Sequence, residues 1–206
     1  MTATSSQRAS LIEKYRNINV DYDWWDSTYD MFTEDMKAVG IDVQRMYFSG
    51  FWSQGDGACF EGSLEDPLKY LDHHHKDQYP MIRKLLEHEG SVYARCEHRG
   101  YYYHQYCTEF WVDADTLTDM LPQPTEFHEV IVEQWQEQLQ DEMDAFEKDI
   151  IEQWRTYMGD LYRKLEEEYD YLVSDEAVWG TIEANELDQD LEADEDEDED
   201  GDVLAA

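Results

Sequence analysis

The stretch that decides the fold runs from Thr125 to Val173 and reads TEFHEVIVEQWQEQLQDEMDAFEKDIIEQWRTYMGDLYRKLEEEYDYLV. Pro122 and Pro124 stop what precedes it, and Thr125 can cap the first helical turn. Apolar residues then recur every three or four positions, which indicates one apolar stripe along a helix. The stripe consists of Phe127, Ile131, Trp135, Leu139, Met143, Phe146, Ile150, Trp154, Tyr157, Leu161, Leu165, Tyr169 and Leu172. At about 1.5 Å per residue the helix would reach about 70 Å, too long for one small sheet to cover.

The opposite side of this predicted helix is acidic. It carries ten carboxylates between Glu126 and Glu152, with Lys148 as the single basic residue among them. The ten are Glu126, Glu129, Glu133, Glu137, Asp141, Glu142, Asp144, Glu147, Asp149 and Glu152. Like charges four positions apart destabilise a helix by roughly 0.2–0.5 kcal/mol per pair. We therefore interpret these residues as a surface that binds a basic partner, and the alternative is a solvated acidic face without a function.

The apolar stripe extends beyond what a small domain can cover. We expect the part after Phe146 to need a second surface, and self-association is the simplest source of one. The residues expected at this contact are Trp154, Tyr157, Leu161 and Leu165. The sequence therefore predicts a homodimer.

The charge of the chain is concentrated in its second half. The net charge is -36; residues 1–112 carry 18 acidic and 11 basic residues, and residues 113–206 carry 33 and 4. A polyanion repels nucleic acid and anionic membranes and attracts basic surfaces. The composition therefore excludes direct nucleic-acid binding and favours a basic protein as the partner.

The first residues and the cysteines indicate a cytosolic protein. The opening MTATSSQRASLIEKY lacks the basic and apolar regions of a secretory signal, and no apolar run is long enough to span a membrane. Cys59, Cys96 and Cys107 are odd in number and have no framework spacing, which indicates reduced thiols.

Two β-hairpins are predicted before the long helix. Ile41–Trp52 and Ala58–Gly62 are rich in strand-forming residues and flank SQGDG, which we interpret as a turn; a phosphate cradle would need a helix directly after it. Ser91–His98 and Tyr102–Val112 form the second hairpin, across Arg99-Gly100.

Helices are predicted around these hairpins. They cover residues 9–16, residues 24–39 with Gly40 as the stop, and residues 66–89 with an interruption near Pro80. The fold class is therefore α+β: a small antiparallel sheet of two hairpins with flanking helices at 1–121, and one long acidic helix at 122–182. Glu192–Asp202 is nearly all Asp and Glu, a run that repels itself and buries too little surface to fold, so residues 183–206 are predicted to be a disordered acidic tail.

The second hairpin holds the best candidate for a metal site in the sequence. With the turn at Gly100, Cys96 would face His104, and His98 would share their face. Structural zinc sites usually contain paired knuckles such as C-x2-C, which are absent. His73–His75 point about 100° apart on a helix and do not converge. We expect no metal, no cofactor and no catalytic residue.

Part of the chain resembles a known group of proteins. VDYDWWDSTYD at 20–30 and MYFSGFWSQGDGACFEG at 46–62 resemble segments of small, mostly uncharacterised bacteriophage proteins. The resemblance covers about residues 15–65 and implies a phage origin and expression in the host bacterial cytoplasm. It carries over no functional residues. Small, very acidic phage proteins are often DNA mimics that inhibit host DNA-binding proteins, and this analogy extends the resemblance.

Three functions follow as hypotheses. The first is a DNA mimic that inhibits a host DNA-binding protein: a topoisomerase such as gyrase, a restriction or other nuclease complex, or a nucleoid protein. The second is an acidic assembly or chaperone-like protein that binds a basic partner without imitating DNA. The third is a metal-dependent enzyme that uses the Cys/His hairpin. The first agrees best with the acidic helix, so we expect a binding protein and not an enzyme.

Overall fold

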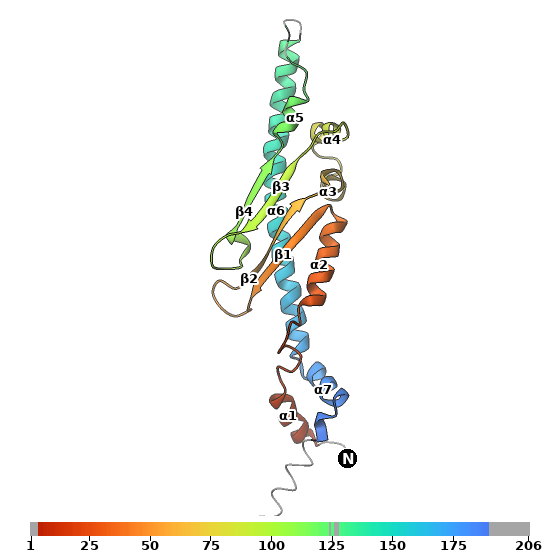
Figure 1. The fold of residues 1–206 in the computed structure, drawn as a ribbon, viewed down its shortest axis with the longest axis vertical. Helices are drawn as coiled ribbons and strands as arrows, with labels where there is room; N and C mark the ends of the chain where they lie inside the picture. The colour runs from red at the N-terminus through yellow and green to blue at the C-terminus, as the bar shows by residue number, and fades with distance from the viewer. Residues whose placement is uncertain (1–3, 124, 126–127, 190–206) are drawn as a thin grey trace, which may run out of the picture. The chain divides into compact units, whose positions relative to one another are not determined.

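The computed structural model describes residues 4–123, 125 and 128–189, and it confirms the predicted α+β class. One antiparallel sheet has the strand order β1-β2-β3-β4, and helices flank it (Figure 1). In chain order the elements are α1 (Ser5–Lys14), α2 (Asp26–Ala38), β1 (Ile41–Ser49), β2 (Gly57–Leu64), α3 (Pro67–His74), α4 (Pro80–Leu86), β3 (Tyr93–His98), η1 (Gln105–Cys107), β4 (Thr108–Asp113), α5 (Asp115–Asp119), α6 (Glu129–Leu172), α7 (Asp175–Ala184) and η2 (Leu187–Gln189).

The chain divides into two compact units, and α6 contributes to both. Residues 28–164 form one unit, and the other combines residues 1–27 with residues 165–206. This division differs from the boundary expected at residues 121–122. The reason is that α6 up to Lys164 shares its core with the sheet and so belongs to the same unit.

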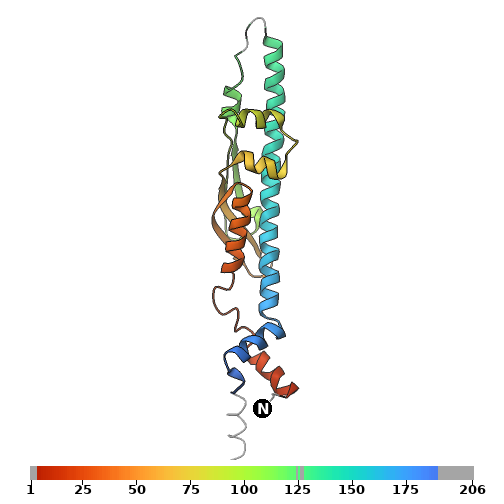
Figure 2. The same cartoon turned by 90° about the vertical axis from the view of Figure 1, so that its right-hand side faces the viewer.

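The larger unit has two layers, with α2 and α6 on one face of the sheet (Figures 1 and 2). Phe60 on β2 joins them: its ring centroid lies 5.7 Å from that of Phe32 on α2 and 5.8 Å from that of Trp154 on α6. Lys164 at the end of this part of α6 pairs with Asp35 of α2 at 2.9 Å. The sheet therefore buries one face and leaves the other open, as antiparallel sheets commonly do.

Both predicted hairpins are present. In the first, Ile41 pairs with Leu64 and Ser49 with Gly57, and the Asp56 carboxylate accepts hydrogen bonds from the backbone N–H groups of Trp52 and Ser53 in the turn. The turn interpretation of SQGDG is therefore confirmed. Gly40 follows α2 with a φ of 87°, which is the left-handed conformation that glycine adopts at little cost after a helix.

The apolar stripe of α6 is covered by the chain itself. Trp154, Leu161 and Leu165 are fully buried, and Trp154 also contacts the Phe110 ring of β4. Tyr157 is half-buried, and its hydroxyl lies 2.5 Å from His74 Nε2. The expectation that these residues need a second copy is therefore wrong, because the sheet and the neighbouring helices supply the surface that sequence periodicity could not show.

Three of the four large apolar side chains that α6 leaves exposed lie near its beginning, and the fourth, Tyr171, lies at its end. Val130, Ile131 and Trp135 are 44 to 66% exposed, whereas Val132 between them is buried. The beginning of α6 is therefore the part of the helix that its neighbours cover least, and not the part after Phe146.

The smaller unit pairs the two ends of the chain. Helices α1 and α7 share a small core made of Leu11, Ile12, Val178 and Ile182. Partly buried Tyr15, Ile18, Trp179 and Leu187 pack around it. This core explains why α7 forms, although the sequence pattern thins at this point.

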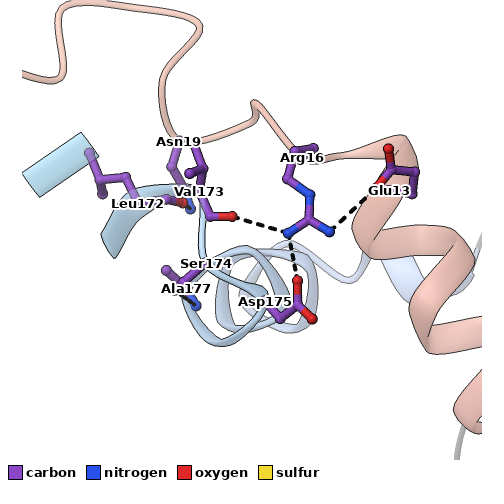
Figure 3. Close-up of polar contacts among 8 residues, drawn as sticks. All are labelled: Glu13, Arg16, Asn19, Leu172, Val173, Ser174, Asp175 and Ala177. Carbon is purple, nitrogen blue, oxygen red and sulfur yellow. Dashed lines mark hydrogen bonds and ion pairs between the residues drawn. The ribbon is translucent and has the colours of Figure 1, made fainter. Parts of the chain in front are cut away.

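Polar side chains that follow α1 close the end of α6 (Figure 3). The last carbonyl groups of a helix have no partner within it. Here the Arg16 guanidinium donates to the carbonyl of Val173 at 3.1 Å and to the Asp175 carboxylate at 2.5 Å. Asn19 donates its side-chain N–H to the carbonyl of Leu172 at 2.9 Å. These contacts satisfy the C-terminal carbonyls of α6 and place a cation at the negative end of the helix dipole.

The first residues of the predicted disordered tail are ordered. Residues 183–184 complete α7, and residues 187–189 form η2, whose Leu187 packs against the small core. The prediction of disorder is therefore wrong for these residues. Residues 190–206 lie outside the described part of the chain.

Candidate partner-binding surface

Seven of the ten carboxylates predicted to bind a partner form one exposed surface on α6. These are Glu129, Glu133, Glu137, Asp141, Asp144, Glu147 and Glu152, which we call the acidic row. At 3.6 residues per turn they fall within an arc of about 140° on the helix. The helical periodicity of the sequence therefore located this surface correctly.

Basic residues are scarce along the acidic row in the described part of the chain. None of its seven carboxylates lies in an ion pair there, and the polar contact of the row is a hydrogen bond from Gln140 to Asp144 at 2.8 Å. Lys148 is the one base between Glu129 and Glu152. Lys148 lies within the arc of the row, and the seven carboxylates around it still give a net negative field, which attracts a basic surface.

Glu142 belongs to the structure rather than to this surface. Its carboxylate accepts hydrogen bonds from the backbone N–H groups of Met81 at 2.9 Å and Ile82 at 3.2 Å, in the first turn of α4. The residue before that helix, Tyr79, has a φ of 55° and provides no side-chain cap. Glu142 therefore caps α4 from α6, a role that residues sixty positions apart in sequence cannot reveal.

Asp149 is also turned towards α3 and α4. It accepts a hydrogen bond from the Tyr79 hydroxyl, and His75 Nδ1 lies 3.7 Å away. Burial, followed by the contact with Asp149, raises the pKa of Tyr79. Glu142 and Asp149 are therefore wrong as partner-binding residues, because the fold already uses both carboxylates. Glu126 lies outside the described residues.

The histidine run packs against α6 on the same side as Glu142 and Asp149. His74 contacts Tyr157, as described above, and its ring also lies 4.6 Å from that of Tyr70. Burial, followed by the neighbouring His73 and His75, lowers the pKa of His74 to about 4. His74 is therefore neutral at pH 7 and serves as a packed ring rather than as a solvated charge.

The Cys/His candidates do not come together. His98 pairs with Thr108 and Cys96 with Phe110, so the expected pairing of Cys96 with His104 is wrong. The reason is that the connection between β3 and β4 is longer than a tight turn at Gly100 and contains η1.

Each candidate ligand has its own neighbours instead. The Cys96 thiol donates to the carbonyl of Phe60, and burial raises its pKa. His98 packs between Tyr47 and Tyr103, and His104 stacks on Tyr106. Among the described residues, no group of three or more His, Cys, Asp or Glu side chains is arranged to hold a metal ion.

Comparisons with known proteins add a family. A model of a domain of unknown function (DUF8835) matches residues 24–175, which include the sheet and the whole of α6. No curated protein and no solved structure matches the chain. In the described part of the chain, no helix combines the length and the apolar composition that a membrane span requires.

Proposed function

The chain belongs to the DUF8835 family, and we propose that it is an acidic DNA mimic that binds and inhibits a DNA-binding protein. The observation that carries this proposal is the acidic row, whose seven exposed carboxylates form no ion pair in the described chain. Each carboxylate stands where a phosphate would stand, and binding releases counterions from lysines and arginines of the partner.

The charge spacing supports mimicry of part of one DNA strand. The acidic row extends over 24 residues from Glu129 to Glu152, which is about 35 Å of helix. Seven carboxylates over this length give about one charge per 5 Å, compared with about one per 3.4 Å along a DNA strand. Because Glu142 and Asp149 are engaged elsewhere, the match is sparser than the sequence alone indicates.

The target and its compartment follow from the resemblance to phage proteins. We place the protein in the host bacterial cytoplasm, where a topoisomerase such as gyrase, a nuclease complex or a nucleoid protein would be its target. Such an inhibitor would serve host takeover or escape from host defence. The homodimer stays a prediction, which light scattering at micromolar concentration tests, since the residues proposed for its interface are covered within the chain.

An acidic assembly or chaperone-like protein is the second candidate. The feature that favours it is the run of acidic residues from Glu192 to Asp202, which would bind basic surfaces without the geometry of DNA. Deletion of residues 190–206 separates the two: loss of binding identifies the run as the agent, and retained binding favours the acidic row.

Capture from a bacterial lysate tests the proposal. The purified protein is immobilised, and bound proteins are eluted with duplex DNA and identified by mass spectrometry. We expect DNA-binding proteins in the eluate, and their retention should fall steeply with salt. Retention that duplex DNA does not reverse would contradict mimicry, and metal analysis of the same protein tests the enzyme alternative.

A further inference from the structure

Strand β4 lies at the edge of the sheet, and its outer side is unpaired. Figure 1 shows β3 on one side of β4 and no strand on the other. The backbone N–H of Arg99 donates to the carbonyl of Cys107 at 2.7 Å, just beyond the paired residues. Hydrogen-bonded pairs alternate along an antiparallel ladder, so Glu109, Trp111 and Asp113 bond to β3.

The residues between them point their backbone groups outward. Phe110 and Val112 therefore direct their N–H and C=O groups away from β3. In the described part of the chain, no other element bonds to these groups. An edge of this kind is a template for a further strand.

Three adjoining hollows follow this edge. The first, of 650 Å³, is lined by Phe110, Val112 and Glu147 among others. The second, of 480 Å³, shares Phe110 and adds Ile151 of α6, and the third, of 280 Å³, shares Val112 and Glu147 and adds Asp144. We call these adjoining hollows the edge groove; it follows the free edge of β4 beside α6, and the first hollow extends over β3 side chains from Tyr93 to Arg99. Six residues of strand correspond to about 20 Å, the length of a short extended peptide.

The charges of the edge groove select its occupant. Asp113, Asp144 and Glu147 line it without an ion pair in the described chain. The basic residues at its rim are engaged: Arg95 and Arg99 both pair with Glu97. Arg155 at the far end holds its guanidinium 5.3 Å from the centroid of the Phe110 ring. Arg155 has no ion pair in the described chain, but the lining holds six acidic side chains against three basic ones, so the net charge of the edge groove is negative.

We propose that the edge groove binds an extended, lysine- or arginine-bearing segment of a partner protein as a fifth strand. The segment exchanges backbone hydrogen bonds with Phe110 and Val112, and its basic side chains meet Asp144 and Glu147. A second copy of this chain fits poorly, because pairing two β4 strands would bring Asp113, Asp144 and Glu147 of both copies together. The inference shares two carboxylates with the acidic row, but it does not depend on DNA mimicry.

Two synthetic peptides test this proposal on the unaltered protein. Lys-Val-Lys-Val-Lys-Val-Lys can form a strand, whereas Lys-Pro-Lys-Pro-Lys-Pro-Lys has the same charge but lacks half of the backbone donors and disfavours a ladder. We expect the first to bind at least about tenfold more tightly, which corresponds to about 1.4 kcal/mol. It should also slow hydrogen exchange at the Phe110 and Val112 amides. Equal binding of both peptides would mean charge attraction alone and would overturn the proposal.

A variant gives the second arm of the test. Val112→Pro removes one outward N–H and leaves the ladder to β3 intact, since proline is tolerated at the outer side of an edge strand. It should weaken binding of the valine peptide and leave that of the proline peptide unchanged. If the folded variant binds the valine peptide as tightly as the parent does, the proposal is contradicted. It is also contradicted if the parent protein is a dimer and Val112→Pro dissociates it, because the occupant of the groove would then be a second copy of the chain. The peptide comparison stands even if the variant does not fold. Neither arm involves a DNA-binding protein, so their failure leaves the DNA-mimic proposal intact, and failure of that proposal leaves this one.

Discussion

The two sides of α6 between Glu129 and Glu152 use the same kind of residue for different purposes. On the side that faces α3 and α4, Glu142 caps a helix and Asp149 accepts a hydrogen bond from Tyr79. On the other side, the carboxylates of the acidic row form no ion pair in the described chain. A carboxylate that the fold needs is paired with specific donors, whereas one that is available to a partner is exposed and unpaired. The comparison shows that acidity alone does not define the binding surface.

The largest effect separates two tryptophans of the same helix. Trp154→Ala should destabilise the protein by about 3–5 kcal/mol, because the side chain is fully buried against Phe60 and Phe110. Trp135→Ala, at a site that is 44% exposed, should change stability by less than about 1 kcal/mol. Urea unfolding measures both. Equal effects would mean that Trp154 is not the centre of the core that we describe.

A smaller effect separates two neighbouring carboxylates. Glu142→Ala should cost about 1–2 kcal/mol, since it leaves the first turn of α4 without its cap. Asp141→Ala is the matched control at an exposed position and should be neutral or slightly stabilising. Denaturant midpoints of the two variants decide the matter. If both lose the same stability, the division of α6 into two sides fails.

Neutralising four residues of the acidic row should increase the stability of the protein rather than decrease it. The combined changes Glu129→Gln, Glu133→Gln, Glu137→Gln and Asp141→Asn remove three repulsions between residues four positions apart. We expect a gain of roughly 0.6–1.5 kcal/mol at low salt, and a smaller gain at high salt, because salt screens the repulsion. Thermal unfolding at two salt concentrations measures this. A loss of stability would show that the row contributes to the fold.

The smallest effect concerns pH. Burial lowers the pKa of His74 to about 4, below its unfolded value near 6.5. The unfolded chain therefore binds the proton more readily, so the stabilisation is present above pH 6.5 and is lost as the pH falls towards 4. The effect is modest because solvent screens a half-buried ring. The urea midpoint of His74→Gln should depend less on pH between 7 and 5 than that of the parent, whereas exposed His73→Gln should behave like the parent.

The sequence predicts the fold class because its signals are local. Alternation in the strands, Gly40 after α2 and the apolar period of α6 each depend on residues close together in the chain. The failures are long-range. Glu142 meets α4, and Trp154 meets Phe60 and Phe110, across distances in sequence for which periodicity carries no information. Helix α7 was missed for the same reason, since its core comes from α1 at the other end of the chain.

The candidate site divides in the same way. The exposed face of α6 follows from helical spacing, so the acidic row could be predicted. Which acidic side chains of α6 bond within the fold depends on where α3 and α4 pack against it, and no local sequence pattern predicts that packing. The edge groove depends on strand order, which places β4 and not another strand at the free edge.

The most direct test of the central claim compares two sets of charge removal in one capture experiment. The first variant carries the four changes in the acidic row, and the second carries Glu166→Gln, Glu167→Gln, Glu168→Gln and Asp170→Asn near the end of the same helix. Both variants lose four negative charges, so any difference in the partners that they retain is due to the location of those charges on α6. We predict that the first variant loses the DNA-displaceable partners from a bacterial lysate and shows a flatter dependence of retention on salt, while the second behaves like the parent. Equal retention by both variants would contradict the claim that the acidic row is the binding surface.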